Sequence, residues 1–179
     1  DEIEVIIEAT GDPGAGARHA MAAIYHGKHI VMVNVEADAL VGPLLARHAE
    51  EAGLVYSLAS GDQPALICDL VDWARMNGFG VVCAGKGTKF LPAYHTSTPD
   101  TVWDHYGFTP EQITQGGFNP VLLNSFLDGT KAAIEMASVA NATGLKPQPH
   151  GLGFPPGGID HIADLCRPAS DGGVLSHTG

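Results

Sequence analysis

Residues 5–34 read VIIEATGDPGAGARHAMAAIYHGKHIVMVN, and this stretch decides the fold class. An apolar run ends in a turn at Thr10 and Gly11, an alanine-rich helical stretch follows, and a second apolar run ends at Asn34. This order is typical of the strand–helix–strand unit of a doubly wound sheet, in which ligands bind beyond the carboxyl ends of the parallel strands. We therefore expect Thr10, Gly11 and Asn34 to face a bound ligand.

The same alternation continues along the chain. Each predicted strand is a continuous apolar run, which is typical of a parallel sheet buried on both faces. The fold class is therefore α/β, with the second half of a Rossmann-type doubly wound parallel sheet coming first. The predicted strands are residues 3–9, 29–34, 54–59 and 79–84, and the predicted helices are residues 16–26, 39–52 and 64–77.

The character of the sequence changes after residue 84. Two short helices are predicted to open at Thr98-Pro99 and Thr109-Pro110, because threonine is a good N-cap and proline a good first helical residue. A long helix is predicted over residues 121–143, and proline and glycine dominate from there on. We predict two parts: residues 1–84 as the C-terminal half of an NAD(P)-binding Rossmann domain, and residues 85–179 as the mainly helical start of a catalytic or substrate-binding domain.

The composition of the chain limits the classes of function that we expect. The 179 residues are 45% hydrophobic and 16% charged, which suits a compact globule. The net charge of −11 argues against a nucleic acid or an anionic membrane as a partner, because phosphates would be repelled. The three cysteines form no CxxC pair, and neither a signal peptide nor a membrane-spanning run is recognisable. These features predict a cytoplasmic protein with free thiols.

A dinucleotide-binding GxGxxG motif is missing from the sequence. The glycine-rich run over residues 11–16 has a different spacing and contains a proline. Either the chain is not a dinucleotide-binding domain, or the first half of that domain precedes it. We favour the second interpretation, in which the chain is an internal part of a longer polypeptide.

The predicted long helix carries a narrow polar stripe. Its members are separated by 4, 3 and 4 residues, so they share one face of a helix whose other faces are apolar. This pattern favours a buried helix with one side lining a cleft. The alternative is a solvated stripe with internal ion pairs from Asp128 to Lys131 and from Lys131 to Glu135. The stripe consists of Asn124, Asp128, Lys131 and Glu135.

A second candidate is the loop GKGTKFLPAYH over residues 85–95. It places Lys86 and Lys89 close together in a chain with only nine lysines and arginines, and it ends at His95. Glycine lets the backbone approach a ligand closely, and lysine binds phosphate as a compact charge. We expect a small anionic substrate here, and the alternative is an ordinary solvated loop.

Polar residues also follow the second strand. An asparagine at position 34 can hold a nicotinamide or a substrate hydroxyl group. Glu36 and Asp38 are alternatively the start of the next helix, where acidic side chains favour the helix dipole.

Several sequence blocks resemble the homoserine-dehydrogenase-like oxidoreductases, and most closely the deoxyxylulose-phosphate-reductoisomerase-like group. The resemblance implies a Rossmann domain and a catalytic domain, with reduction of a carbonyl group by NADPH. It covers nearly the whole chain. The blocks are EATG (residues 8–11), GKHIVMVN (27–34), GDQPALICDLVDWAR (61–75), GKGTK (85–89), YHTSTPDTVW (94–103) and NSFLDGTKAAIEMA (124–137).

The best-known activity of that group implies the substrate 1-deoxy-D-xylulose 5-phosphate, which is rearranged and reduced to the isoprenoid precursor 2-C-methyl-D-erythritol 4-phosphate. The chain also departs from the pattern. In homoserine dehydrogenases a lysine follows the strand-end asparagine, whereas Val35 follows Asn34 here, and the Asp-Ser-Glu metal motif of true reductoisomerases is absent. We also expect a homo-oligomer.

The resemblance and the residues together predict a hydride transfer to a carbonyl. Lys131 would donate to the developing alkoxide, with Asp128 orienting it and Lys89 assisting. If a rearrangement precedes reduction, Asp128 and Glu135 would hold Mg²⁺ or Mn²⁺. The alternatives are a dehydrogenase that acts on a semialdehyde or hydroxy acid, and a non-catalytic nucleotide-sensing domain. Lys86, Lys89, His95 and Asn124 would bind the substrate, and Thr10, Gly11, Asn34 and Glu36 the nicotinamide side of NADPH.

Overall fold

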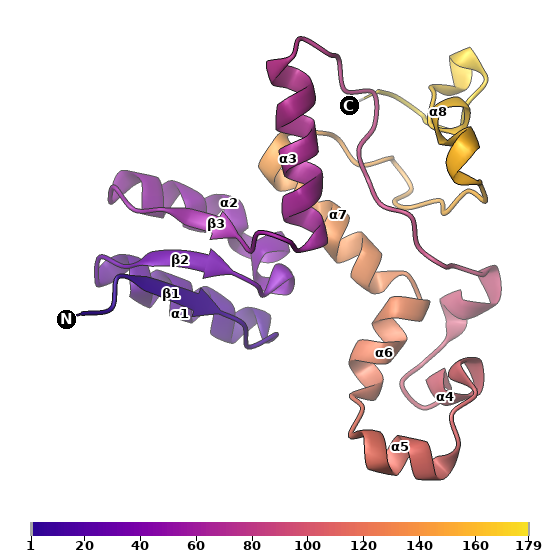
Figure 1. Ribbon diagram of the computed structural model, residues 1–179, viewed down its shortest axis with the longest axis horizontal. Coiled ribbons are helices and arrows are strands. Elements are labelled where there is room, and N and C mark those ends of the chain that lie inside the picture. Colours follow the sequence, from indigo (N-terminus) through magenta and orange to yellow (C-terminus); the bar gives the residue numbers. More distant parts are fainter. Residues whose placement is uncertain (1, 179) are drawn as a thin grey trace.

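The computed structural model describes residues 2–178. A small parallel sheet with its helices comes first, and a mainly helical region follows (Figure 1). The first part contains β1 (Val5–Glu8), α1 (Pro13–Tyr25), β2 (His29–Met32), α2 (Val35–Glu51), β3 (Tyr56–Leu58) and α3 (Gln63–Met76). The second contains η1 (Pro92–Thr96), α4 (Val102–Tyr106), α5 (Pro110–Gly116), α6 (Pro120–Leu127), α7 (Thr130–Thr143), η2 (Ile159–His161), α8 (Ile162–Leu165) and η3 (Ala169–Asp171).

The sheet has the order β1-β2-β3, and both pairs of neighbours are parallel. Ile6 pairs with Ile30, and Ile30 pairs with Tyr56. Each strand adds to the side of the previous one, with a helix as the crossover, as in a Rossmann-like sheet. The predicted fold class is therefore confirmed.

Capping residues explain where the first two helices begin. The side chain of Asp12 accepts a hydrogen bond from the Ala15 amide, so α1 begins at Pro13. Asn34 accepts a hydrogen bond from the Ala37 amide, so α2 begins directly after it. Both helices therefore start a few residues earlier than predicted, and the stretch after Asn34 is helix rather than loop.

The first hydrophobic core lies between the sheet and α1 and α2. Ile30 and Met32 on β2 are almost fully buried and pack against alanines of α1 and Leu45 of α2. Gly16 allows the two helices to approach closely at their N-terminal ends, since a Cβ atom there would lie 2.6 Å from the Asn34 Nδ2 atom. The core thus holds the carboxyl ends of β1 and β2 together.

Among residues 2–178, helices cover only one face of the sheet. Figure 1 shows α1 and α2 behind the strands. On the other face, Val5 is 49% exposed and Ile7 is 68% exposed. The prediction of burial on both faces is therefore wrong within residues 2–178, because the next helix, α3, packs against α7.

The predicted strand over residues 79–84 is also absent from the sheet. Val81 and Ala84 from this segment pack instead against Ile67 and Val71 of α3 and Val139 of α7, which form a second core. The apolar side chains find burial in a helix–helix core, so the segment does not need to extend the sheet. An apolar run of this length cannot by itself distinguish the two environments.

The predicted long helix is divided into α6 and α7. The break lies at Asp128 and Gly129, and Gly129 has a φ of +89°, which is incompatible with a continuous right-handed helix. The Asp128 side chain accepts a hydrogen bond from the Thr130 amide and so helps to start α7. Asn124 and Asp128 therefore do not share one helix face with Lys131 and Glu135.

The short helices follow their predicted caps in part. At α5, Thr109 and Gln112 form a reciprocal capping box. The helix predicted to open at Thr98 begins only at Val102, after a turn held by hydrogen bonds between Thr98 and Thr101.

Over residues 2–178, no helix combines the length and the apolar character needed to cross a membrane.

Candidate active site

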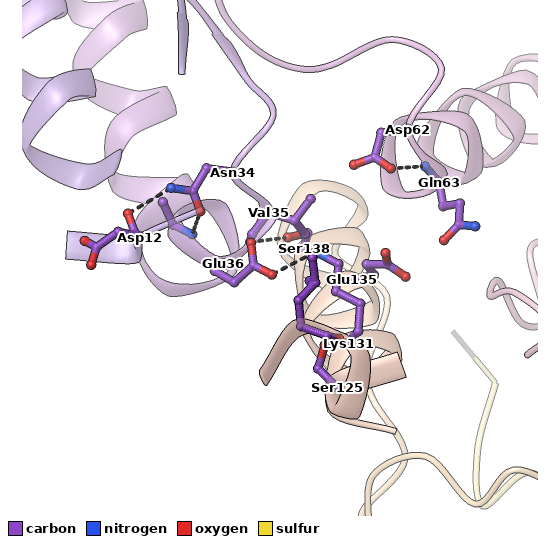
Figure 2. A network of polar contacts seen from close by, with 12 residues as sticks. Asp12, Asn34, Val35, Glu36, Asp62, Gln63, Ser125, Lys131, Glu135 and Ser138 are labelled. Carbon is purple, nitrogen blue, oxygen red and sulfur yellow. Dashed lines mark hydrogen bonds and ion pairs between the residues drawn. The ribbon is translucent and has the colours of Figure 1, made fainter. Parts of the chain in front are cut away.

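The carboxyl ends of β1 and β2 meet at one edge of the sheet. Thr10 and Gly11 follow β1 and are exposed, whereas Asn34 follows β2 and is only 2% exposed. The Asn34 Nδ2 atom donates to the Asp12 carbonyl oxygen at 2.9 Å (Figure 2). The same atom also donates to the Thr10 hydroxyl oxygen at 3.4 Å. Asn34 thus ties the first loop to α2, and its own contact with a cofactor stays a prediction.

A buried glutamate beneath this edge was not among the predicted site residues. Glu8, the last residue of β1, is 3% exposed, and its Oε1 atom lies 3.1 Å from the Nδ1 atom of His19 on α1. Burial raises the pKa of Glu8, but hydrogen bonds from Thr10, Asn34 and His19 outweigh it and leave that pKa below its ordinary value. The sequence signal is an acidic residue that ends an apolar strand.

Lys131 reaches this edge from the helical region. Its Nζ atom donates to the Oε1 atom of Glu36 at 2.8 Å, and both side chains are mostly buried, with 17% and 26% exposed. Two turns further along α7, the hydroxyl of Ser138 donates to the Val35 carbonyl oxygen at 3.4 Å. Figure 2 shows Glu36 reaching from α2 towards Lys131, so the start of α7 closes the site beside the second strand.

A second lysine, Lys86, pairs with another glutamate of α7. It forms an ion pair with Glu135, which is 4% exposed, and its Nζ atom also donates to the Oε1 atom of Gln63 at 2.5 Å. Lys131 and Glu135 therefore pair with other parts of the chain and not with each other. The alternative of a solvated stripe with internal pairs is wrong within the described residues.

Asn124 and Asp128 do not join these two ion pairs. Asn124 donates to the Ser97 carbonyl oxygen at 3.2 Å and to the Oδ2 atom of Asp128 at 3.0 Å. The other carboxylate oxygen of Asp128 accepts from the Thr130 amide. The predicted orientation of Lys131 by Asp128 is thus replaced by its pairing with Glu36.

Lys89 and His95, the other two candidate residues of the loop over residues 85–95, take no part in these ion pairs in the described part of the chain. Lys89 lines a separate pocket of about 280 Å³ with Tyr94 and His105. His95 lies edge-on to the ring of Phe90, with the ring centroids 6.4 Å apart. The loop over residues 85–95 therefore directs Lys86 towards α7 and Lys89 towards α4 and α6.

A larger pocket of about 440 Å³ lies between α2, β3, α3 and α7. It contains no predicted site residue. The Tyr56 hydroxyl donates to the Oδ1 atom of Asp38 at 2.8 Å here. Burial raises the pKa of Asp38, although hydrogen bonds from Tyr56 and Ser138 oppose this, and burial also raises the pKa of Tyr56. Asp38 thus lies in the first turn of α2, and its burial reflects the packing of α2 against β3 and α7.

A metal site built on Asp128 and Glu135 does not fit these positions. Asp128 already accepts hydrogen bonds from Asn124 and Thr130, and Glu135 is held in an ion pair with Lys86. Residues 2–178 also contain no group of three or more histidine, cysteine, aspartate or glutamate residues that could hold a metal ion.

Doubly wound parallel sheets of this Rossmann-like kind bind ligands, often nucleotides, beyond the carboxyl ends of their strands. Residues 61–179 match the family model described as oxidoreductase DRL, catalytic domain. The match covers more than half of the chain, so the protein belongs to this family and carries an oxidoreductase catalytic domain. No curated protein matches the sequence.

The matched region begins after β3 and includes α3. The predicted boundary at residue 84 lies further along the chain and stays a prediction. The packing of α3 on α7 agrees with the earlier start of the family match.

Proposed function

We propose that this protein is an NADPH-dependent oxidoreductase that reduces the carbonyl group of a small phosphorylated sugar. The observation that carries the proposal is the hydrogen bond between Lys131 and Glu36, at the edge where doubly wound sheets bind nucleotides. The membership of the oxidoreductase family supports the same class of reaction.

Lys131 has the chemistry that carbonyl reduction requires. Negative charge develops on the carbonyl oxygen as the carbonyl carbon receives a hydride, which NADPH supplies when bound. A fixed ammonium group in a site with little water stabilises this charge and transfers a proton from its Nζ atom to the oxygen. Glu36 holds the ammonium in place, so little reorganisation is needed during the reaction.

Lys86 provides a second positive charge held by the protein. Glu135 is buried and fixes Lys86 through their ion pair, while Gln63 accepts a further hydrogen bond. This arrangement suits the binding of a hydroxyl or carbonyl oxygen of the substrate. The Nδ2 atom of Asn124 already donates twice, whereas its Oδ1 atom has no hydrogen-bond partner in the described part of the chain, so Asn124 would bind the substrate by accepting from a hydroxyl group.

The described residues fit the nicotinamide half of the cofactor. Thr10 and Gly11 are exposed at the carboxyl edge, Asn34 donates to Thr10, and Glu36 lies two residues after Asn34 in the first turn of α2. The start of α1 does not fit a phosphate, because the Asp12 carboxylate already accepts from the helix amide of Ala15. The residues that hold the cofactor phosphates would therefore belong to another part of the protein.

The particular substrate follows from the reductoisomerase-like resemblance. The test incubates the complete natural protein with NADPH and 1-deoxy-D-xylulose 5-phosphate, follows the loss of NADPH absorbance and identifies the product by mass spectrometry. We expect NADPH oxidation and formation of 2-C-methyl-D-erythritol 4-phosphate. Oxidation only with an amino-acid semialdehyde would support a homoserine-dehydrogenase-like activity instead. Cofactor binding without oxidation by any of these carbonyl compounds would contradict the proposal.

A further inference from the structure

A small pocket lies between the loop that follows residue 85 and the helices α4 and α6. Figure 1 shows these two helices in the lower right part of the view. Its volume is about 280 Å³. The polar side chains that line it come from three separate parts of the chain, and apolar side chains of α6 complete it. The lining includes Lys89, Tyr94, His105 and Tyr106, together with Phe126 and Leu127.

Lys89 differs from the two lysines of the candidate active site. Lys86 and Lys131 are each paired with a glutamate. Across residues 2–178, in contrast, no ion pair or hydrogen bond involves the side chain of Lys89, and the lining residues of its pocket include no carboxylate. In a chain with a net charge of −11, an unpaired cation in a pocket free of acidic groups favours an anionic ligand.

The other polar groups of the pocket can donate hydrogen bonds to the same anion. In the described part of the chain, no hydrogen bond involves the hydroxyl groups of Tyr94 and Tyr106 or the ring of His105. The rings of Tyr94 and His105 lie edge to face, with centroids 5.1 Å apart. Burial and the nearby Tyr94 raise the pKa of Tyr106, so its hydroxyl remains a protonated donor at neutral pH.

We propose that this pocket binds the phosphoryl group of the substrate, with Lys89 as the positive charge and Tyr94, His105 and Tyr106 as further hydrogen-bond donors. The inference rests on the proposed function for the identity of the substrate. A phosphate monoester has three strongly accepting oxygens and nearly two negative charges, which match one lysine and several neutral donors. Lys86, which the sequence grouped with Lys89, would then contact a different part of the substrate.

The size and position of the pocket favour the substrate over the cofactor as the source of the phosphate. Pockets for complete ligands usually have volumes of about 300–1,000 Å³, so this pocket suits one end of a small molecule. Its lining residues all belong to the region after residue 85, whereas the residues expected to contact the nicotinamide follow β1 and β2. The 2′-phosphate of NADPH carries the same chemistry, and the experiment must separate the two.

The first test measures the binding of inorganic phosphate to the complete natural protein by calorimetry at constant ionic strength. We expect saturable binding that weakens about tenfold or more in Lys89→Met, and that also weakens in Tyr94→Phe, which removes one hydroxyl. Lys146→Met is the matched control, because Lys146 is also an exposed lysine and lies outside the pocket. Unchanged phosphate binding in Lys89→Met would overturn the proposal.

The second test separates the sources of the phosphate by steady-state kinetics. In Lys89→Met, we expect the KM for the sugar phosphate to rise about tenfold or more while the KM for NADPH does not change. A rise confined to the KM for NADPH would overturn the assignment to the substrate. Absence of any carbonyl reduction would contradict the proposed function alone, because the phosphate titration needs no turnover and still decides whether the pocket binds the anion.

Discussion

Lys131 is the residue on which the proposed chemistry depends most. Its ammonium group is mostly buried and is fixed by one glutamate from α2. A lysine held in this way carries a localised positive charge in a site with little water, where it stabilises a developing alkoxide strongly. Glu36, which α2 presents in its first turn, keeps that charge at the edge of the sheet.

We predict that Lys131→Met lowers kcat about 100-fold to 1,000-fold, because it removes a donor that acts in the transition state. The affinity for NADPH, measured by fluorescence titration, should change little. Lys146→Met serves as the control for the loss of a lysine, since Lys146 is exposed. Unchanged turnover in Lys131→Met would remove this residue from the mechanism.

The second prediction concerns Glu8 and the pH dependence of the free energy of unfolding. Its pKa in the folded protein is held below the ordinary value of 4.5, so the charged form stabilises the fold. This contribution is complete above pH 4.5 and is lost as the pH falls through the lowered pKa. Glu8→Gln should therefore reduce the free energy of unfolding at neutral pH, and the difference from the natural protein should shrink in acid.

Urea unfolding at several pH values measures this effect. The control is Glu4→Gln, since Glu4 is exposed just before the same strand. An equal difference between Glu8→Gln and the natural protein at neutral and acidic pH would show that the charge of Glu8 does not stabilise the fold.

Among the elements, the turn between α6 and α7 has the largest effect on the site. Because Gly129 ends one helix and allows the next to start in a new direction, α7 can bring Lys131 to α2 and Glu135 to the loop after residue 85. A single continuous helix would keep Asn124 and Asp128 on the same face as these residues.

We predict that Gly129→Ala lowers the free energy of unfolding by about 2 kcal/mol, measured by urea unfolding. The backbone φ of +89° is unfavourable for alanine, and its Cβ atom would lie 2.9 Å from the Cζ atom of Phe154. Gly87→Ala is the matched control, because nothing lies within 4 Å of a Cβ atom at that position. Equal stability of the two variants would contradict the strained turn.

At the scale of the whole molecule, α7 joins the sheet region to the helical region. It contacts α2 through Lys131 and Ser138, and it contacts α3 through the second core. The pair of Lys86 and Glu135 adds the loop after residue 85 to the same assembly, and Gln63 connects it to the start of α3. The predicted homo-oligomer stays a prediction at this scale.

We predict that Lys86→Met destabilises the protein by about 3 kcal/mol, because it leaves the Glu135 carboxylate buried without its partner. The double variant Lys86→Met with Glu135→Leu should recover most of this loss, since it removes both charges together. Urea unfolding of the two single variants and the double variant measures the coupling. Additive losses in the double variant would contradict a direct interaction between the two side chains.

The alternation of strands and helices over residues 5–58 was predictable from local patterns. Apolar runs, glycine turns and N-cap residues such as Asp12 and Asn34 act over a few neighbouring residues, so they can be recognised in one stretch of chain. The ends of β1 and β2 were therefore identified correctly as neighbours in the sheet. The break at Asp128-Gly129 also has a local signal, an aspartate followed by a glycine, but the helical spacing of the polar stripe around it favours a continuous helix.

Local patterns do not reveal which distant groups meet. Lys131 and Glu36 are 95 positions apart, and the partners Lys86 and Glu135 also come from separate elements. The burial of residues 79–84 against α3 and α7, and the isolation of Lys89 in its own pocket, likewise depend on how the elements pack. The amino-acid sequence alone therefore determined the order of the helices and strands and the types of candidate residues, because these depend on short-range patterns. Which charges pair was decided by the tertiary structure, because an ion pair forms only where the folded backbone brings both groups within a few ångströms.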